Sequence, residues 1–277
     1  MAKAIGAGRV AVVTGAASGI GFALSERFCQ EGMRVVMADV EEPALAEAAD
    51  VLASRGAEVL PVPTDVARPE QMDRLRDRAL EAFGGVHVLC NNAGVVGEFV
   101  PLWEVRQADW DWVLGVNLWG VINGIRSFVP TLLRQDAAHV VNTASMAGLI
   151  PNGLGPYSVT KHGVVALSED LYLALRQRGP QVGVSVLCPG FVRTRIVDAD
   201  RNRPGGLGEV DPSTAAVREM LRQLQDAGMD PTEVAGQVVA AVHSGRFYVL
   251  THPGSGESVS NWIERVLAGS PPEPPRI

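Results

Sequence analysis

A tyrosine, a lysine and a serine in the middle of the chain could together move a proton. Tyr157 and Lys161 stand four residues apart, so on a helix they would share one face. An ammonium group near a phenol lowers the phenol pKa from its reference of ~10 toward working pH. Such a phenol can act as the base in alcohol oxidation or as the acid in carbonyl reduction. Ser145 follows an apolar run, from where its hydroxyl could bond to a substrate oxygen. Because Tyr and Lys also meet at this spacing by chance, the interpretation depends on what surrounds them.

A glycine-rich stretch near the N-terminus could bind a dinucleotide. The segment TGAASGIG at 14–21 follows an apolar run and precedes a helical pattern. Glycines allow the backbone to approach a pyrophosphate closely, and a helix N-terminus offers free N–H groups and a positive dipole end. A tight turn needed only for packing would have the same composition. The candidate pyrophosphate residues are Gly15, Ser18, Gly19, Ile20 and Gly21.

A carboxylate at the end of the second apolar run indicates which dinucleotide would bind. Asp39 follows Gly21 by 18 residues, close to the ~20 expected for a carboxylate that accepts from ribose hydroxyls. A carboxylate there would repel a 2′-phosphate, and the following residues 40–43 (VEEP) contain no Arg or Lys. The sequence therefore favours NAD over NADP.

The elements that must position these residues alternate along the chain. Short apolar runs occur at 10–14, 35–38, 57–62, 86–90, 139–143, 184–188 and 247–250. Helical patterns occur at 20–31, 42–55, 69–83, 107–135, 156–178, 212–227, 231–244 and 257–268. This alternation predicts an α/β fold, a doubly wound parallel sheet with helices on both faces, in a single domain spanning 1–277.

Three segments have a distinct character. The segment 107–135 is apolar nearly all round, which predicts one helix buried in the domain or against a partner. Residues 190–212 predict a long loop, interpreted as a substrate lid, and 269–277 a Pro-rich tail. The loop holds an arginine cluster that could grip an anionic substrate or, as we favour, simply be solvated. Its members are Arg193, Arg195, Arg201 and Arg203.

Composition excludes several classes of function. The 277 residues carry a net charge of −7, which disfavours nucleic acid as a partner. No uncharged stretch suits a membrane span, and the three cysteines fit no metal-site spacing, so we expect a cytoplasmic protein without a metal. Of the 24 basic residues only Lys3 and Lys161 are lysines. A GC-rich codon pool would favour arginine generally but does not explain the lysine at 161.

Taken together, these motifs resemble the short-chain dehydrogenase/reductase family in its compact single-domain form. The matching set is TGAASGIG at 14–21, Asp65 after the third strand, NNAG at 91–94, Asn117, Ser145, YSVTK at 157–161 and PG-x-x-x-T at 189–194. The resemblance covers about residues 9–250. It implies a Rossmann-like seven-stranded sheet in the order 3-2-1-4-5-6-7, and reversible hydride transfer between a nicotinamide cofactor and a carbinol carbon.

The resemblance also implies a role for each matched residue. Tyr157 would be the acid/base, Lys161 would lower its pKa and bind the nicotinamide ribose, and Ser145 would position the substrate oxygen. Asn117 would hold a water of the proton relay. Besides the glycine turn and Asp39, the implied cofactor contacts are Asp65 and Val66 at the adenine, Asn91, Ala93 and Gly94 behind the fourth strand, and Pro189, Gly190, Val192 and Thr194 at the carboxamide.

The expected substrate is a hydrophobic secondary alcohol or ketone, because the residues expected near Ser145 and Tyr157 are mostly apolar. They are Val95, Val96, Ala147, Leu149, Ile150, Pro151 and Trp262. The family usually packs the helices that start near 107 and 156 between subunits, which implies a homotetramer or a dimer. Two alternatives remain: an NADP-linked ketoreductase of a biosynthetic pathway, and a non-catalytic nucleotide-sensing protein on the same fold.

Overall fold

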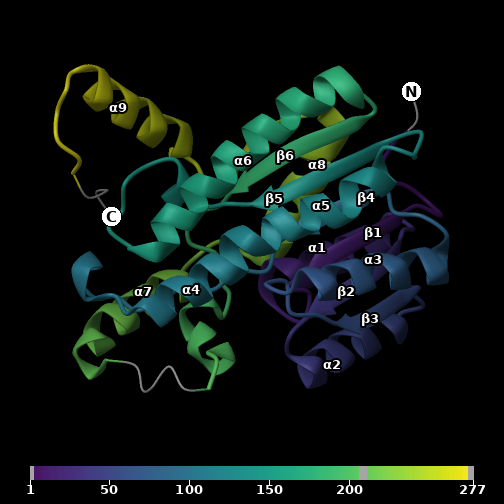
Figure 1. Cartoon of the computed structure of the whole chain (residues 1–277), viewed down its shortest axis with the longest axis horizontal. Coiled ribbons are helices and arrows are strands. Elements are labelled where there is room, and N and C mark those ends of the chain that lie inside the picture. The colour runs from purple at the N-terminus through teal and green to yellow at the C-terminus, as the bar shows by residue number, and fades with distance from the viewer. Residues whose placement is uncertain (1–2, 206–210, 274–277) are drawn as a thin grey trace.

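Seven parallel strands form the central layer of the molecule (Figure 1). The computed structural model describes residues 3–205 and 211–273. The strands are β1 (Val10–Thr14), β2 (Arg34–Asp39), β3 (Val59–Pro63), β4 (Val88–Asn91), β5 (Ala138–Thr143), β6 (Val182–Cys188) and β7 (Tyr248–Leu250). Their order is β3-β2-β1-β4-β5-β6-β7. The predicted fold class and strand order are confirmed.

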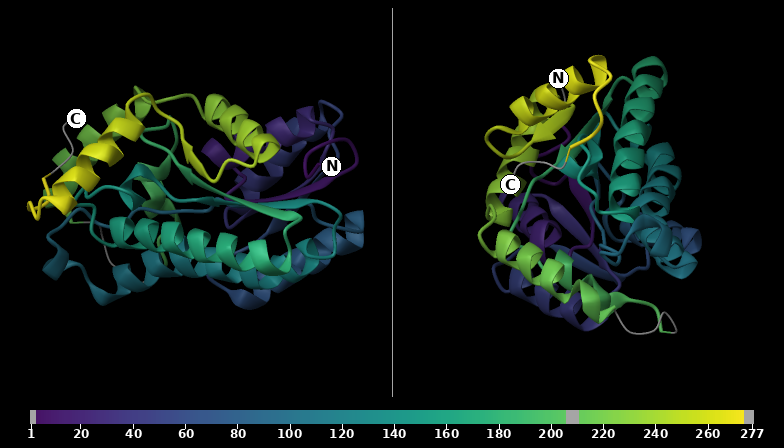
Figure 2. Two further views of the ribbon diagram at one scale, coloured as in Figure 1. Left: turned by 90° about the horizontal axis from the view of Figure 1, so that it is seen from above. Right: turned by 90° about the vertical axis from the view of Figure 1, so that its left-hand side faces the viewer.

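Helices cover both faces of this sheet, as the two further views show (Figure 2). One face carries α1 (Gly19–Gln30), α2 (Glu42–Ala53) and α8 (Pro231–Ser244); the other carries α3 (Pro69–Phe83), α5 (Gly120–Leu132) and α6 (Pro156–Arg178). Pro69, Pro156 and Pro231 each begin a helix, where the N–H that proline lacks would have no helical partner. The predicted boundaries of α1, α2, α3, α6 and α8 hold to within two residues, whereas α5 is only part of the helix predicted over 107–135.

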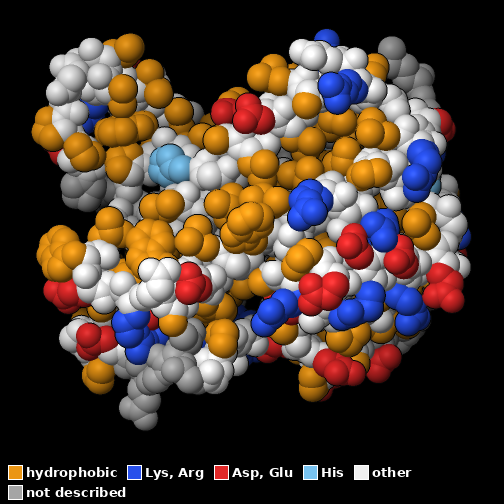
Figure 3. Space-filling view, in the orientation of Figure 1, with side chains coloured by type: hydrophobic (Ala, Val, Ile, Leu, Met, Phe, Trp, Pro, Cys, Tyr) orange, Lys and Arg blue, Asp and Glu red, His pale blue; other side chains and the backbone are white. Residues whose placement is uncertain are grey.

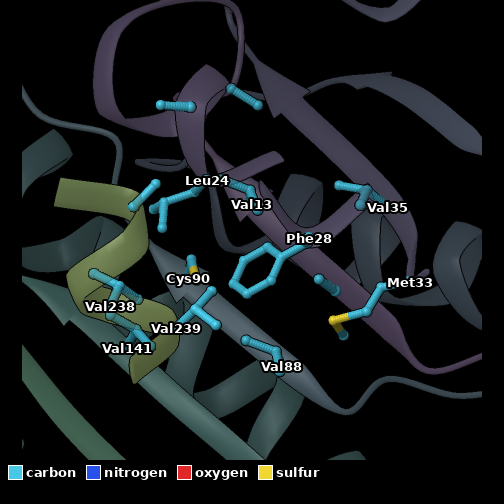
Figure 4. Close-up of a cluster of buried hydrophobic side chains, with 14 of the residues drawn as sticks. Val13, Leu24, Phe28, Met33, Val35, Val88, Cys90, Val141, Val238 and Val239 are labelled. Carbon is cyan, nitrogen blue, oxygen red and sulfur yellow. The ribbon is translucent and has the colours of Figure 1, made fainter. Parts of the chain in front are cut away.

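Alternating side chains of each strand feed two separate hydrophobic clusters. Val13 of β1 packs with Phe28 of α1 and Val238 of α8, and Figure 4 shows these side chains around the same centre. Its neighbour Val12 points to the other face and joins the cluster that contains Phe128 of α5. Because both faces are covered, the strands are apolar throughout and not alternately polar. This double packing fixes the sheet that supports the site.

The segment 107–135 is not the single buried helix that its sequence predicts. It consists of α4 (Gln107–Leu114), the π-helical turn η2 (Gly115–Trp119) and α5. Trp112 is buried on α4, whereas Trp119 is 53% exposed. The extra residue of a π turn shifts the helix faces, and such turns often occur at functional sites. Here the turn places Asn117 fully inside the protein and leaves Trp119 on the surface.

The C-terminal third contains shorter elements and a helix that stands apart. The segment 190–212 holds η4 (Ile196–Asn202), but 206–210, part of the predicted lid, lie outside the described residues. Further along the C-terminal third are η5 (Pro212–Thr214), α7 (Ala215–Asp226) and α9 (Ser255–Leu267). Two other short turns lie upstream, namely η1 (Leu102–Glu104) before α4 and η3 (Met146–Gly148) after β5. In Figure 1 α9 extends away from the sheet, and only Ser255 of that helix is buried. The predicted tail continues from α9 and is described as far as residue 273.

Across 3–205 and 211–273, no helix is both long and apolar enough to cross a membrane. The same ranges contain no group of three His, Cys, Asp or Glu side chains placed to hold a metal ion.

Candidate active site

One cavity of about 510 Å³ follows the carboxyl-terminal edge of the sheet. It opens where the strand order reverses between β1 and β4, which is where open α/β sheets bind ligands. The predicted residues that line it are Gly15, Ser18, Gly19, Ile20, Asp39, Asp65, Val66, Ala93, Gly94, Val95, Ser145, Tyr157, Lys161, Pro189, Gly190, Val192 and Thr194. The fold therefore gathers residues that end or follow six strands, β1 to β6, into one continuous space.

The glycine turn forms a bare backbone cradle at one end of the cavity. Gly15 and Gly19 have φ values of +67° and +55°, which other residues rarely adopt. A Cβ on Gly21 would lie 2.0 Å from the carbonyl oxygen of Gly15, so any side chain there would displace the turn. Gly21 itself does not line the cavity. The first turn of α1 contains no acidic residue, and its N-cap Ser18 makes no side-chain cap hydrogen bond. A pyrophosphate fits this arrangement, because the helix N–H groups keep their capacity for an anion.

Asp39 is held firmly at the wall beside that turn. Its Oδ2 accepts from the backbone N–H of Ala17 at 3.0 Å, and its Oδ1 accepts from that of Glu41 at 3.1 Å. Burial raises the pKa of Asp39, while these backbone hydrogen bonds act in the opposite direction. The carboxylate lines the cavity in a fixed orientation, which suits an acceptor for ribose hydroxyls. Asp65 lies further along the same wall and accepts from the N–H of Ala67 at 3.0 Å.

Ser145, Tyr157 and Lys161 meet at the other end of the cavity. Ser145 lies just beyond β5, and its Oγ accepts from the N–H of Ala147 at 3.1 Å. Tyr157 lies in the first turn of α6, and Lys161 one turn later has its Nζ 5.5 Å from the centre of the tyrosine ring. Lys161 is 2% exposed and donates to the carbonyl oxygen of Thr143 at 2.8 Å. The helical spacing thus brings the phenol and the ammonium to the same wall.

Burial governs the proton equilibria of this group. It lowers the pKa of Lys161 to about 8, because the ammonium loses its hydration. It also raises the pKa of Tyr157, although a hydrogen bond with Ser145 favours the ionised phenol. The expected fall of the phenol pKa toward neutrality is therefore absent from this arrangement. The hydration that the Tyr157 phenolate would lose on burial outweighs the stabilisation that the hydrogen bond with Ser145 provides.

Two predicted asparagines lie behind the cavity and not on its wall. The Asn117 side chain donates to the carbonyl oxygen of Val95 at 2.9 Å and accepts from its N–H at 2.8 Å. Asn91 donates to Oδ1 of Asn142 at 2.9 Å beneath the sheet edge. Asn117 therefore fixes the segment after β4, and its water-holding role stays a prediction, as does the cofactor contact of Asn91.

The apolar end of the cavity differs from the expected substrate pocket. Val95 lines it, but Ala147, Ile150 and Trp262 do not. Its wall is completed by residues of α4, of η2 and of the segment after β6, namely Trp112, Val116, Ile196, Ala199 and Pro204. Ile196, Ala199 and Pro204 belong to the 190–212 segment that the sequence predicted as a substrate lid. Trp112 and Val116 were not predicted at the cavity, because the all-round apolar pattern of 107–135 does not show which side faces it.

The arginine cluster of 190–212 is not uniformly solvated, which corrects the favoured interpretation. The Arg203 side chain is 6% exposed and pairs with Asp109, and its Nη1 lies 2.9 Å from Oε1 of Glu98. Arg106 pairs with the same two carboxylates at 2.8 Å each. Composition gave no reason to single out Arg203, since the partners are about 100 residues away in sequence.

The chain belongs to the short-chain dehydrogenase family, whose model, described as short chain dehydrogenase, matches residues 9–204. The protein is accordingly an oxidoreductase that acts on hydroxyl or keto groups and has the NAD-binding Rossmann fold of that family.

Its relatives include a 1-deoxy-11-beta-hydroxypentalenate dehydrogenase from Streptomyces exfoliatus, which is 42% identical over 247 residues. The matched region covers 88% of this chain and 83% of the relative. Among solved structures, a short chain dehydrogenase/reductase from Burkholderia phymatum in complex with NAD is 45% identical, with a TM-score of 0.93 over 100% of both chains. A variant actinorhodin polyketide ketoreductase with NADPH is 27% identical, with a TM-score of 0.75 over 92% of this chain and 99% of the other.

Proposed function

We propose that this protein transfers a hydride between NAD(H) and a hydrophobic secondary alcohol or ketone, with Tyr157 as the acid/base. The observation that carries the proposal is the joint lining of one cavity by Ser145, Tyr157 and Lys161 at one end and by the glycine turn and Asp39 at the other. A dinucleotide on the turn would reach the tyrosine along the same wall.

Each polar group then has a defined task. In oxidation, Tyr157 takes the hydroxyl proton of the substrate when its phenol is ionised, a form that burial disfavours and that the hydrogen bond with Ser145 and the nearby Lys161 ammonium favour. Ser145 would donate a hydrogen bond to the same substrate oxygen. The Lys161 ammonium has three N–H donors, of which one goes to Thr143, so the others are available for a ribose hydroxyl. The nicotinamide cofactor, when bound, supplies the hydride acceptor or donor. Reduction reverses the proton transfer at Tyr157.

The preference for NAD rests on Asp39. Its carboxylate is fixed by two backbone N–H groups beside the turn, where it would attract ribose hydroxyls and repel a 2′-phosphate. The Burkholderia relative with bound NAD supports this preference. NADP-linked reduction is the second candidate, because Arg68, Arg195 and Arg201 also line the cavity and the ketoreductase relative holds NADPH.

A hydrophobic substrate is supported by the walls near Tyr157. Val95 and Trp112 belong to one buried apolar cluster, and Ile196 and Tyr157 pack against it. A substrate with many hydroxyl groups would leave them without partners there, at a cost of about 1–3 kcal/mol each. The hydroxypentalenate named for the Streptomyces relative is a carboxylate that bears a hydroxyl group, so acidic substrates belong in the panel tested.

A screen for NADH production over alcohols graded by size and polarity tests this proposal. We expect turnover with apolar secondary alcohols, NAD preferred over NADP, and little rate with sugars or short hydroxy acids. Faster turnover with NADP would favour the reductase alternative. Binding of NADH without turnover on the whole panel would favour the nucleotide-sensing alternative.

We also propose that the protein is a cytoplasmic homotetramer or dimer. Trp119, Val159 and Leu173 are exposed on the helices expected to pack between subunits. Figure 3 shows hydrophobic side chains gathered on α9 as well, where Ile263 and Leu267 are exposed. All three cysteines are unpaired, as a reducing compartment would allow. Light scattering of the purified protein and fractionation of producing cells test these two points.

A further inference from the structure

The segment after β6 crosses the whole cavity. β6 and β2 are four positions apart in the sheet, so their ends are separated by about 19 Å at ~4.8 Å per strand. Between them lie the ends of β5, β4 and β1, which carry Ser145, the turn after Asn91 and the glycine turn. Yet η4, which follows β6, touches Glu41, which follows β2. A dinucleotide bound between the glycine turn and Tyr157 would lie beneath this crossing.

The contact at the far end is made by one carboxylate. Glu41 Oε1 accepts from Nε of Arg201 at 2.9 Å and from Nδ2 of Asn202 at 2.8 Å. Arg201 is held in turn by its own segment, because its Nη1 donates to the carbonyl oxygens of Arg195 and Asp198. The side chains of Arg201 and Glu41 are 26% and 24% exposed, so water screens the pair incompletely. Burial alone would raise the pKa of Glu41, but these hydrogen bonds outweigh it and lower it.

We propose that Glu41 is a positioning residue that ties η4 across the bound dinucleotide, and that this tie must open before the cofactor leaves. The inference rests on the proposed function, since it assumes that a nicotinamide cofactor occupies the cavity. Glu41, Arg201 and Asn202 all line that cavity, so the tie borders the space to be vacated. The next residue in this segment with a buried charge, Arg203, is anchored to Glu98 and Asp109. When the contact between Glu41 and Arg201 breaks, the segment therefore stays attached through Arg203.

The dissociation rate of NADH from the full-length protein tests the tie. Stopped-flow displacement by excess NAD, followed by nicotinamide fluorescence, would compare the unmodified chain with Glu41→Gln, Arg201→Gln and the double variant. Because the ion pair is partly exposed and this carboxylate also holds Asn202, we expect each single variant to raise the dissociation rate of NADH about 3- to 10-fold. The double variant should be no faster than the faster single one, since both remove the same contact.

A matched control exists on the same segment. Asp198 of η4 pairs with Arg222 of α7 at 2.9 Å, and neither residue lines the cavity. Arg222→Gln removes an ion pair of the same segment whose side chains are more exposed, at 43% and 42%, without opening the crossing. The rate at which this variant releases NADH should therefore stay within twofold of the unmodified chain. An equal acceleration in this control would overturn the inference, because any loosening of η4 would then suffice.

The outcomes separate the tie from the proposed function. Tight NADH binding with unchanged dissociation rates in both single variants overturns the tie and leaves the function standing. Acceleration in Glu41→Gln alone also overturns it, since Arg201 would then not be the partner that matters. Failure of the unmodified chain to bind NADH overturns the proposed function and this inference with it.

Discussion

Lys161 and Arg203 are two buried cations whose surroundings are opposite in kind. Lys161 lies at the same cavity wall as Tyr157, and its ammonium donates to the carbonyl oxygen of Thr143. Arg203 lies in the segment that crosses the cavity, between the carboxylates of Glu98 and Asp109. The first charge is buried without a neutralising partner, so its pKa falls to about 8, whereas the second belongs to a network of two guanidinium and two carboxylate groups.

The difference sets a charge proposed to serve the reaction against a charge that has buried carboxylates to pair with. A buried cation without an anion costs the folded state free energy, so it persists where its charge has a use. A guanidinium fork suits two carboxylates, while a compact ammonium suits a narrow site beside a phenol. A Cβ on Gly94 would lie 3.4 Å from Nζ of Lys161, which indicates how little room that site leaves. Four substitutions test this contrast.

The largest effect is expected from Tyr157→Phe, which removes the proton carrier that Lys161 is proposed to serve. Turnover should fall by ~10²–10⁴-fold, the usual contribution of a positioned acid or base. NADH binding should remain close to that of the unmodified chain, because the ring is kept. Steady-state rates and fluorescence titration measure the two quantities. More than about a tenth of the original rate would remove Tyr157 from the mechanism and Lys161 from its chemical role.

Arg203→Met should destabilise the fold by about 2–4 kcal/mol. It leaves Glu98 and Asp109, both buried, with Arg106 as their remaining cation. Denaturant unfolding at neutral pH measures the change, and Arg222→Gln on the exposed face of α7 provides a control expected to lose less than ~1 kcal/mol. An unchanged midpoint would mean that the network does not hold the segment.

Lys161→Met should change stability in the other direction while turnover collapses. The pKa of Lys161 is about 8 in the folded state and 10.5 in the unfolded state. Below pH 8 the amine is protonated in both states, but the charge is buried only in the folded state. Its charge therefore destabilises the folded state at pH 7. Removing the charge should stabilise the fold at pH 7 by about 1–2 kcal/mol, after allowing for the lost bond to Thr143. The gain should shrink as the pH rises from 8 to 10.5. Unfolding at pH 7 and pH 10 checks this, and a loss of stability at pH 7 would contradict it.

Asp39→Ala should have the smallest effect, because Asp39 is proposed to contribute to cofactor choice and not to proton transfer. We expect NAD affinity to fall about tenfold and the preference over NADP to narrow, since the ribose acceptor and the repulsion of a 2′-phosphate disappear together. Titration with NADH and NADPH measures both. A wild-type protein that already prefers NADPH would show that Arg68, Arg195 and Arg201 outweigh this carboxylate.

Local patterns made much of the fold and of the site predictable. The seven apolar runs became the seven strands because parallel strands are buried on both faces and show it in their composition. The four-residue spacing of Tyr157 and Lys161 placed them on one wall because the helix period is local. The π turn at Gly115–Trp119 was missed, because one extra residue in a helix leaves little trace in an apolar segment. This turn decides that Asn117 is buried and that Trp119 is exposed.

By itself the sequence determined the sheet, the glycine turn, the carboxylate after β2 and the Ser, Tyr and Lys set, because each depends on spacing along the chain or on the end of one strand. It singled out Lys161 by composition, since arginine replaces lysine at all other basic positions except Lys3. Only the tertiary structure decided which arginine is buried and which carboxylates meet it. Glu98, Asp109 and Arg203, like Glu41 and Arg201, come together because strands distant in sequence end at the same edge of the sheet. Burial there also set the direction of each pKa shift, which depends on lost hydration and cannot be read from neighbours in sequence.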